Sequence, residues 1–343
     1  MIKAGLGCMD ASTLAKAPSA THIEHESCPD MVFQSACMKA VVERIEKAAR
    51  HDVDVLFLGE TGTGKDLAAE HLARQGKRRG RSPVHFNCSG IPPTLQQGQL
   101  LGSRSGAYTG ATRDTNGMLF LADGGVLILS DIQDLSLDAQ STLRSFFDRR
   151  VICRLGECEE RRIDVQIVAT MNREFQDLCR DGGFRADLYE RFARLVVRIP
   201  PLRQRREDIP VLVHHTLRKL TEKYGRRISE LDSPFWEFAL TYDWPRNVRQ
   251  LQNVLEQATI EEESSVLHFA TIRGRLEGDG TSAMSLPKVW VPEGRRKRLS
   301  TYPSRRDVEE ALERRGNRIA DSAHDLGVSL RTFYRLRKSL GMI

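Results

Sequence analysis

The chain has 343 residues, of which 40% are hydrophobic and 29% charged, and its formal net charge is +6. Such values are ordinary for a globular protein of two or three domains, and no run approaches the ~18 apolar residues that a membrane-spanning helix needs. Because the first 30 residues also lack a basic start followed by an apolar run, we expect no secretory signal and a cytoplasmic location without a membrane partner. The seven cysteines follow no framework spacing and are interpreted as reduced thiols.

The positive charge is concentrated near the C-terminus. Residues 295–341 contain 13 Lys and Arg against six Asp and Glu, so that the rest of the chain is close to neutral. A basic segment of this kind attracts polyanions such as DNA through their phosphates. The charge distribution therefore predicts a nucleic-acid-binding segment at this end of the chain.

Along the chain, apolar runs and helical patterns predict an α/β domain followed by helices only. Residues 1–30 are short and weakly patterned and are interpreted as an N-terminal arm. Buried strands are expected at Val53–Leu58, Val84–Asn87, Val126–Leu129 and Val165–Thr170. Amphipathic helices are expected at Lys65–Arg74, Leu137–Arg149, Ile209–Tyr224, Pro234–Tyr242 and Asn247–Ile260. The alternation indicates a largely parallel sheet covered on both faces, in a domain over residues 31–270 whose α/β part ends near residue 203 and whose remainder is a helical lid.

The first expected strand leads into a glycine-rich loop with the spacing GxxxxGK, and a helix follows. This order is typical of a phosphate-binding loop, in which backbone N–H groups and the helix N-terminus face the phosphates and the lysine reaches the β and γ oxygens. Asp66 stands where the general motif has a Ser or Thr that binds Mg²⁺. A glycine-rich turn without a ligand is the alternative, which the flanking strand and helix disfavour. The candidate nucleotide-binding residues are Gly59, Glu60, Thr61, Gly62, Thr63, Gly64, Lys65 and Asp66.

A P-loop ATPase also needs an acidic residue after a neighbouring buried strand, where it organises Mg²⁺ and the attacking water. The strand Val126–Leu129 is followed by Ser130 and Asp131, where two consecutive acids are expected. Asp131 is therefore the candidate catalytic acid. Ser130 and Asp131 together are the candidates for association with Mg²⁺ through ATP.

Residues 271–304 are rich in Gly, Ser, Pro and Arg, which predicts a linker. Within the linker, Arg295–Arg298 either contacts DNA phosphates or forms a solvated run of charge. Residues 305–343 fit three short helices, the last of them capped by Ser329, and predict a helix-turn-helix. The alternative is an ordinary helical bundle with a basic surface. The candidate DNA-binding residues are Ser329, Arg331, Thr332, Tyr334, Arg335 and Lys338.

One hexapeptide, at residues 106–111, is similar to the GAFTGA loop of the bacterial enhancer-binding proteins, the AAA+ activators of sigma-54 RNA polymerase. Read alone, it fits any surface turn, but its context resembles this family over roughly residues 33–260 and 306–341. The resemblance implies an α/β fold made of an AAA+ P-loop domain with a helical lid, followed by an all-α Fis-type helix-turn-helix. It also implies that the loop contacts sigma-54. The candidate contact residues are Gly106, Ala107, Tyr108, Thr109, Gly110 and Ala111.

The same resemblance implies roles for single residues around the nucleotide. An acid follows the P-loop lysine in the family, so that Asp66 is normal there. Asn87 matches an asparagine that restrains the catalytic acid, and Asn172 matches the asparagine called sensor I. Arg249 matches the sensor II arginine in the lid.

Two further arginines, Arg185 and Arg191, match family residues that reach the γ-phosphate of the neighbouring subunit; surface arginines in salt bridges are the alternative. Several positions depart from the family pattern, and three of them bear on hydrolysis or on the loop. Ser130 replaces the Mg²⁺-associated Asp, Asp131 replaces the catalytic Glu, and Gln99 replaces an acid before the sigma-54 loop. Asp is one methylene shorter than Glu, and serine carries no charge. We therefore expect weakened hydrolysis, and whether the chain is an efficient ATPase on its own stays open.

The resemblance implies a ring oligomer, hexameric in the family, that binds upstream double-stranded DNA and uses ATP and Mg²⁺ to remodel the sigma-54 RNA polymerase holoenzyme. No receiver or sensing domain is expected before Phe33, so that control is expected from expression level or a partner protein. The alternative is a DNA- and nucleotide-binding regulatory subunit with weak ATPase activity, working in a hetero-oligomer with an intact paralogue. An ATPase with an unrelated remodelling target is a third possibility, which the loop at residues 106–111 disfavours.

Overall fold

The computed structural model describes residues 31–107, 112–172, 174–180, 182–225, 228, 230–262, 266–269 and 312. The chain divides into two units, residues 1–281 and 282–343, and the account below concerns the first. No helix in the described part is both long and apolar enough to cross a membrane. The predicted N-terminal arm and, apart from Leu312, the predicted helix-turn-helix lie outside the described residues, and the domain boundaries stay predictions.

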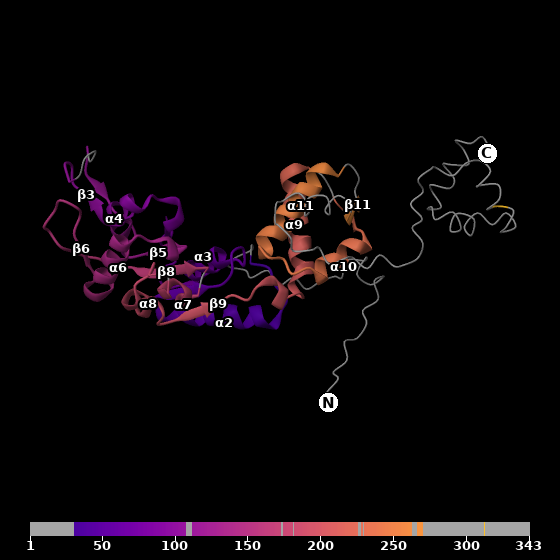
Figure 1. Cartoon of the computed structure of the whole chain (residues 1–343), viewed down its shortest axis with the longest axis horizontal. Helices are drawn as coiled ribbons and strands as arrows, with labels where there is room; N and C mark the ends of the chain where they lie inside the picture. Colours follow the sequence, from indigo (N-terminus) through magenta and orange to yellow (C-terminus); the bar gives the residue numbers. More distant parts are fainter. Residues whose placement is uncertain are drawn as a thin grey trace, which may run out of the picture. The chain divides into compact units, whose positions relative to one another are not determined.

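A five-stranded sheet forms the centre of the α/β part, with all of its strands parallel in the order β2-β5-β8-β1-β9 (Figure 1). Its strands are β1 (Val55–Leu58), β2 (Val84–Asn87), β5 (Val126–Ser130), β8 (Gln166–Met171) and β9 (Val196–Arg198). The four predicted strands are confirmed to within two residues. The edge strand β9 was not predicted, because three residues with a half-buried start give too short an apolar run.

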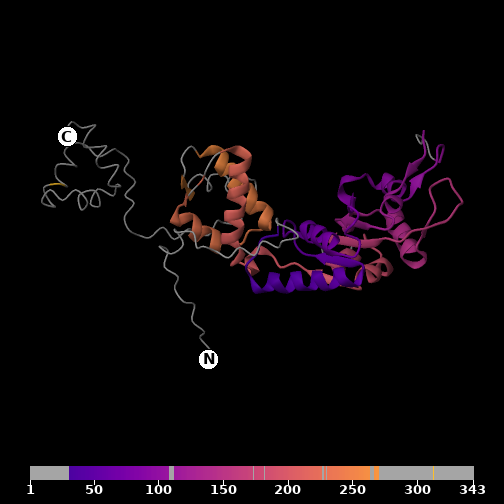
Figure 2. The same ribbon diagram turned by 180° about the vertical axis from the view of Figure 1, so that it is seen from behind.

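Alternate residues of each strand pack on opposite faces of the sheet, as the pleat requires. One face, which includes Phe57, Ile128 and Val168, is covered by α2 (Ala36–His51) and α3 (Lys65–Gln75). The view from behind shows α2 running along this side (Figure 2). The other face packs against helices that follow β2, β5 and β8 in the chain. These helices are α4 (Pro93–Leu101), α5 (Met118–Leu121), α6 (Leu137–Arg149), α7 (Phe175–Arg180) and α8 (Ala186–Phe192).

Three helices form the lid, as predicted: α9 (Asp208–Tyr224), α10 (Ser233–Thr241) and α11 (Asn247–Glu261). The α9 and α11 helices pack together, and Trp244, between α10 and α11, is fully buried. Its indole Nε1–H donates to the Ala239 carbonyl at 2.8 Å, so that this polar atom is satisfied inside the core. Two short strands, β10 (Glu230–Leu231) and β11 (Val266–Leu267), pair beside these helices. The α/β domain with a helical lid is thus confirmed.

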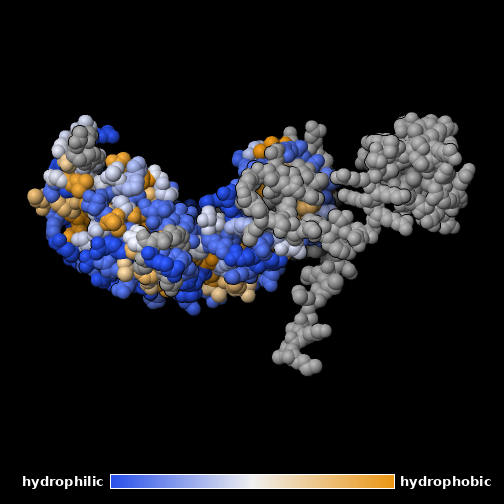
Figure 3. All heavy atoms as spheres, in the orientation of Figure 1, coloured by the Kyte–Doolittle hydropathy of each residue, from blue (hydrophilic) through white to orange (hydrophobic). Residues whose placement is uncertain are grey.

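Two small hairpins project from the far end of the α/β part (Figure 1). The first pairs β3 (Gly102–Ser103) with β4 (Thr115–Asn116), and the second pairs β6 (Val151–Ile152) with β7 (Arg161–Arg162). The surface in this view is mainly hydrophilic, with small and separate hydrophobic areas (Figure 3). The large apolar side chains that are exposed in the described part are scattered along the chain, as is usual for a globular domain.

A buried carboxylate ties the start of the described chain to the lid. Asp208, at the start of α9, is fully buried and accepts hydrogen bonds from the backbone N–H groups of Gln34 and Ser35, each at 2.6 Å. It also accepts one from the Ser35 hydroxyl at 2.9 Å. Beside it lies the buried Arg205, whose guanidinium is 3.7 Å from Asp208. A charge this deep in the protein requires such partners, and together they fix the position of α9.

Candidate nucleotide-binding site

The predicted P-loop connects β1 to α3 at the carboxyl edge of the parallel sheet. Gly62 and Gly64 have φ values of +80° and +101°, which only glycine adopts without strain. Lys65 is only 7% exposed, and its Nζ donates to the Glu60 carbonyl across the loop at 3.0 Å. The Thr63 hydroxyl donates to the same carbonyl at 2.8 Å. Glu60 therefore holds the loop closed, with the lysine inside it.

The lid touches the P-loop through backbone atoms. The N–H of Val248, in the first turn of α11, donates to the Gly62 carbonyl at 3.0 Å. A Cβ on Gly62 would lie 2.2 Å from the Arg246 carbonyl oxygen. Glycine is therefore required at this position for packing as well as for its φ value.

Asn247 joins the lid, the P-loop and the chain between them. It is fully buried and has a φ of +54°, a conformation uncommon outside glycine. Its side-chain amide donates to the Thr61 carbonyl at 3.0 Å and to the Glu60 carboxylate at 3.2 Å. Its side-chain oxygen accepts from the Leu202 N–H at 2.7 Å. All polar groups of its side chain are thus used at the junction.

Two arginines before the lid reach the same loop. The Arg203 guanidinium pairs with the Glu60 carboxylate at 2.8 Å and holds the pKa of that carboxyl below its usual range. Arg205, 4% exposed, donates to the Thr63 carbonyl at 2.7 Å, and burial lowers its pKa. Residues 60–65 are therefore held from the lid side by side chains as well as by backbone.

The acidic corner lies across the loop from these arginines, where β5 and β8 end. Asp131 has a left-handed backbone, with φ and ψ of 56° and 55°. Its carboxylate accepts from the Asn172 amide at 3.3 Å and from the Gln133 amide at 3.2 Å. The Asp131 N–H donates to the Thr170 hydroxyl at 3.1 Å. The structure thus brings the predicted Asp131 and Asn172 together.

Asp66 and Ser130 also meet here. The Ser130 hydroxyl donates to the Asp66 carboxylate at 3.0 Å, and the Thr170 hydroxyl donates to the same oxygen at 3.4 Å. Burial lowers the pKa of Lys65, while the Asp131 and Asp66 carboxylates oppose this shift and Arg249 adds to it. The charges of Asp66, Asp131 and Arg249 therefore all act on Lys65.

Three other predicted residues lie apart from this cluster. The Asn87 side chain accepts from the Ser89 N–H at 3.2 Å and from the Ser89 hydroxyl at 2.8 Å, which caps a short 3-10 turn. In the described contacts it has no hydrogen bond with Asp131, although it lies beside Ser130 in the register of β2 and β5. Its expected restraint of the catalytic acid is not formed here.

Arg185 and Arg191, at the two ends of α8, occupy a different surface. Arg185 pairs with Asp187 at 2.9 Å and Arg191 pairs with Asp148 at 2.6 Å. Their side chains are 40% and 41% exposed. Both guanidinium groups therefore lie at the surface of this chain, and their role toward a neighbouring subunit stays a prediction.

The base of the predicted sigma-54 loop is described, whereas residues 108–111, with Tyr108, Thr109, Gly110 and Ala111, lie outside the described residues. Gly106 is exposed and has a φ of +83°. The Ala107 side chain packs on Gly156 of the neighbouring hairpin, where an added Cβ would lie 2.9 Å from it. Arg104 pairs with Asp114 across the loop base at 2.6 Å and with Glu157 at 2.8 Å. The loop base is thus anchored to the β6–β7 hairpin.

Comparison with known proteins agrees with this arrangement. The family described as "Sigma-54 interaction domain" matches residues 31–198, and the family described as "AAA+ ATPase lid domain" matches residues 203–286. The transcriptional activator RocR of Bacillus subtilis is 32% identical over 310 residues, which cover 89% of this chain and 67% of RocR. The chain belongs to the sigma-54-dependent transcriptional regulators.

A further relative supports this assignment, and a solved structure shares the fold. The phenol regulator MopR of Acinetobacter guillouiae is 34% identical over 312 residues, which cover 90% of this chain and 56% of MopR. The regulator thus spans little more than half the length of this relative. NtrX from Brucella abortus, solved in complex with ATP, shares the fold with a TM-score of 0.65 at 24% identity, covering 91% of this chain and 69% of NtrX.

The sequence predictions miss some residues around the P-loop and name others that lie outside the described residues. The predicted DNA contacts lie outside the described residues, and a Fis-type helix-turn-helix there stays a prediction. Sequence reasoning did not single out Asn247, Arg203, Arg205 or Gln133, which the structure places around the P-loop and Asp131. A signal for Asn247 was present, since it lies two residues before Arg249, the candidate sensor II arginine.

Proposed function

We propose that this regulator binds ATP with Mg²⁺ at the P-loop and, in a ring oligomer on upstream double-stranded DNA, uses its hydrolysis to remodel sigma-54 RNA polymerase holoenzyme. The observation that carries the proposal is the position of Lys65, a buried cation held inside a glycine loop opposite Asp131 and Asn172. NtrX, which shares the fold, was solved in complex with ATP. A P-loop of this form holds phosphates through its backbone N–H groups and its lysine.

The residues at this edge of the sheet fit a nucleotide-bound Mg²⁺. In the part of the chain that the structure describes, no group of three or more His, Cys, Asp or Glu side chains is placed to hold a metal ion alone. Mg²⁺ is usually held by one or two carboxylates together with the phosphates of the substrate, and Asp66 and Asp131 supply two carboxylates beside Lys65. When bound, the metal would neutralise charge on the phosphates. Ser130, Asp66 and Asp131 would hold it or its water, and Asp131 would also orient the attacking water.

The two α8 arginines support an active site completed by assembly. Arg185 and Arg191 are exposed and paired with carboxylates of their own chain. Exposed ion pairs contribute little to stability, so that the phosphate of a neighbouring nucleotide can displace these carboxylates. In the ring, each subunit supplies these two arginines to the nucleotide that its neighbour binds.

A second candidate function is supported by the acidic corner itself. Ser130, where the family has an acid, donates its hydroxyl to Asp66 and brings no charge to the site, and Asn87 bonds Ser89 rather than Asp131. Both features favour weak hydrolysis. In that case the chain is a nucleotide- and DNA-binding subunit that works in a hetero-oligomer with an intact paralogue.

ATPase activity measured against protein concentration separates the two functions. For the first, we expect the turnover per chain to rise with assembly and to fall to background in Asp131→Ala, while ATP binding persists. Restoring the acid in Ser130→Asp should raise turnover severalfold. A turnover that stays flat at every concentration and rises only when a related subunit is added would support the hetero-oligomer instead.

The sigma-54 contact is tested through the loop tip. We expect Thr109→Ala to lose most activation of a sigma-54 promoter in a reconstituted transcription assay, with its ATPase turnover within about twofold of the parent. Arg113→Ala, an exposed change just outside the hexapeptide, is the control and should activate normally. Full activation by Thr109→Ala would remove the sigma-54 part of the proposal.

A further inference from the structure

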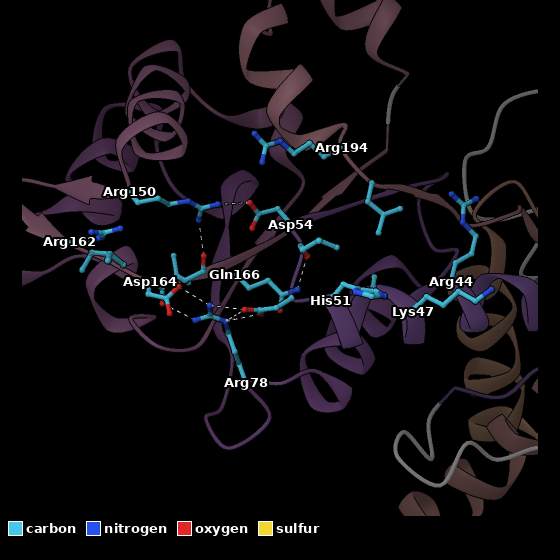
Figure 4. A pocket seen from close by; sticks show the side chains of 16 residues that line it. Arg44, Lys47, His51, Asp54, Arg78, Arg150, Arg162, Asp164, Gln166 and Arg194 are labelled. Atoms are coloured by element: carbon cyan, nitrogen blue, oxygen red, sulfur yellow. Dashed lines mark hydrogen bonds and ion pairs between the residues drawn. The ribbon is translucent and has the colours of Figure 1, made fainter.

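A cavity lies at the opposite edge of the sheet from the P-loop. Its volume is about 810 Å³, within the range of small-molecule sites. The residues that form it come from the end of α2, from the segments before β1, β8 and β9, and from the turns that follow α3 and α6 (Figure 4). Since β1 and β8 are parallel, these segments meet at the amino edge, whereas the P-loop and Asp131 follow the carboxyl ends. The cavity therefore belongs to neither the nucleotide site nor the sigma-54 loop.

The lining carries an excess of positive charge. Six Arg and Lys side chains and three Asp side chains contribute to it, which leaves three net positive charges with His51 neutral. The nine charged lining residues are Arg44, Lys47, Asp52, Asp54, Arg78, Arg150, Arg162, Asp164 and Arg194. A concave site lined by one sign of charge concentrates the field and attracts ligands of the opposite sign.

The three carboxylates are already used within the wall. Arg78 pairs with Asp52 at 2.9 Å and with Asp164 at 2.8 Å, and Arg150 pairs with Asp54 at 2.7 Å. Asp54 also accepts from the Ile167 N–H at 2.7 Å, so that it is fixed to the sheet. These ion pairs stabilise the wall of the cavity. The remaining cations are available to bind a ligand.

Four cations around the cavity have no carboxylate partner among the described residues. Arg44 donates only to the Val196 carbonyl, at 3.1 Å. The charged groups of Lys47, Arg162 and Arg194 have no ion pair or hydrogen bond to any described residue. They come from different elements and surround the cavity in Figure 4. Apolar side chains, including Val53 and Leu195, also line the cavity and offer a surface for an uncharged part of a ligand.

We propose that this cavity binds a small organic ligand with at least two phosphate groups, of the nucleotide class. Two phosphate groups match the three excess positive charges, and arginine forks suit phosphate oxygens. The organic part of the ligand would lie on Val53 and Leu195. A hollow of this volume favours a small ligand over duplex DNA, whose convex backbone is usually met by a flat or extended basic surface.

The experiment counts binding sites for one probe, mant-ADP, with the full-length chain and with inorganic pyrophosphate as competitor. Four proteins are compared: the parent, Lys65→Ala, the double variant R162A/R194A, and the combination of all three changes. Two phosphate sites are expected in the parent, one in each partial variant and none in the combination. R113A/R180A, which removes two exposed arginines away from the cavity, is the matched control and should keep both sites.

The arms of the experiment give distinct outcomes. We expect R162A/R194A to weaken the site that remains in Lys65→Ala about tenfold or more, and pyrophosphate to compete for it in a salt-dependent way. The proposal fails if Lys65→Ala binds neither mant-ADP nor pyrophosphate, or if R162A/R194A binds mant-ADP as the parent does. It also fails if only a ten-residue polyglutamate or duplex DNA binds there, since the site would then serve a macromolecule. If only the proposed P-loop site is wrong, the parent will lack the binding site that depends on Lys65 and will keep the site that depends on Arg162 and Arg194.

Discussion

Replacement of Lys65 by Ala is expected to weaken ATP binding at the P-loop about 100-fold or more. Lys65 is a buried cation, and the loop around it is held by Glu60, Arg205 and the lid. A charge-assisted hydrogen bond contributes about 1.5–3 kcal/mol, and several such bonds to phosphate are lost together with the lysine. A 100-fold loss of affinity corresponds to about 2.7 kcal/mol of binding free energy. Titration with mant-ATP in the R162A/R194A background measures this site alone.

Lys39→Ala provides the control for Lys65→Ala, since Lys39 is exposed on α2 and faces solvent. It should bind mant-ATP as the background protein does. Equal affinities for Lys65→Ala and Lys39→Ala would show that the P-loop is not the nucleotide site. A thermal melt of each protein checks that the lost binding does not come from unfolding.

Replacement of Asn247 by Ala is expected to lower the free energy of unfolding by about 2–4 kcal/mol. The change removes three hydrogen bonds and leaves the buried Leu202 N–H without its acceptor. It also puts a Cβ-bearing residue without a local hydrogen bond at a φ of +54°. Urea denaturation measures the loss, and nucleotide titration should show weaker binding because Thr61 and Glu60 lose their support.

Two variants separate the causes within this prediction. Asn247→Gly loses the same hydrogen bonds but tolerates the positive φ, so that it should retain about 1 kcal/mol more stability than Asn247→Ala. Asn253→Ala changes an exposed asparagine of the same helix and should alter stability by less than about 0.5 kcal/mol. If all three variants unfold alike, the hydrogen bonds of Asn247 do not hold the lid.

Much of the fold could be predicted because long apolar runs and helical periodicity are local signals. The strand Val84–Asn87 and the helix Leu137–Arg149 have their predicted bounds. The α2 helix was not among the predicted elements, although it covers one face of the sheet through residues such as Ile45. Its charged outer face hides a stripe of small and apolar residues. The helix is fixed by packing on β9 and α3, which are tertiary contacts, and by the Ser35 cap, a local signal that was not used.

The candidate site was predictable where a residue acts through its own motif. Lys65, Asp66, Asp131 and Asn172 follow strands of one parallel sheet, and their meeting follows from that topology. The contacts that could not be read from the sequence cross long distances along the chain. Arg203 reaches Glu60 over 143 residues, and Asn247 reaches it over 187. Spacing along the chain says nothing of such partners, because the packing of the lid decides them.

The Asp208 cluster has a consequence for whatever acts on the start of the chain. Asp208 holds the backbone of Gln34 and Ser35, and its neighbour Arg205 holds the Thr63 carbonyl in the P-loop. The chain that enters at residue 31 is therefore joined to the phosphate loop through two buried side chains. Binding energies linked in this way are reciprocal. We therefore expect a nucleotide that orders the loop to strengthen the contacts of Asp208 with Ser35, and a change at Ser35 to alter nucleotide affinity by the same free energy.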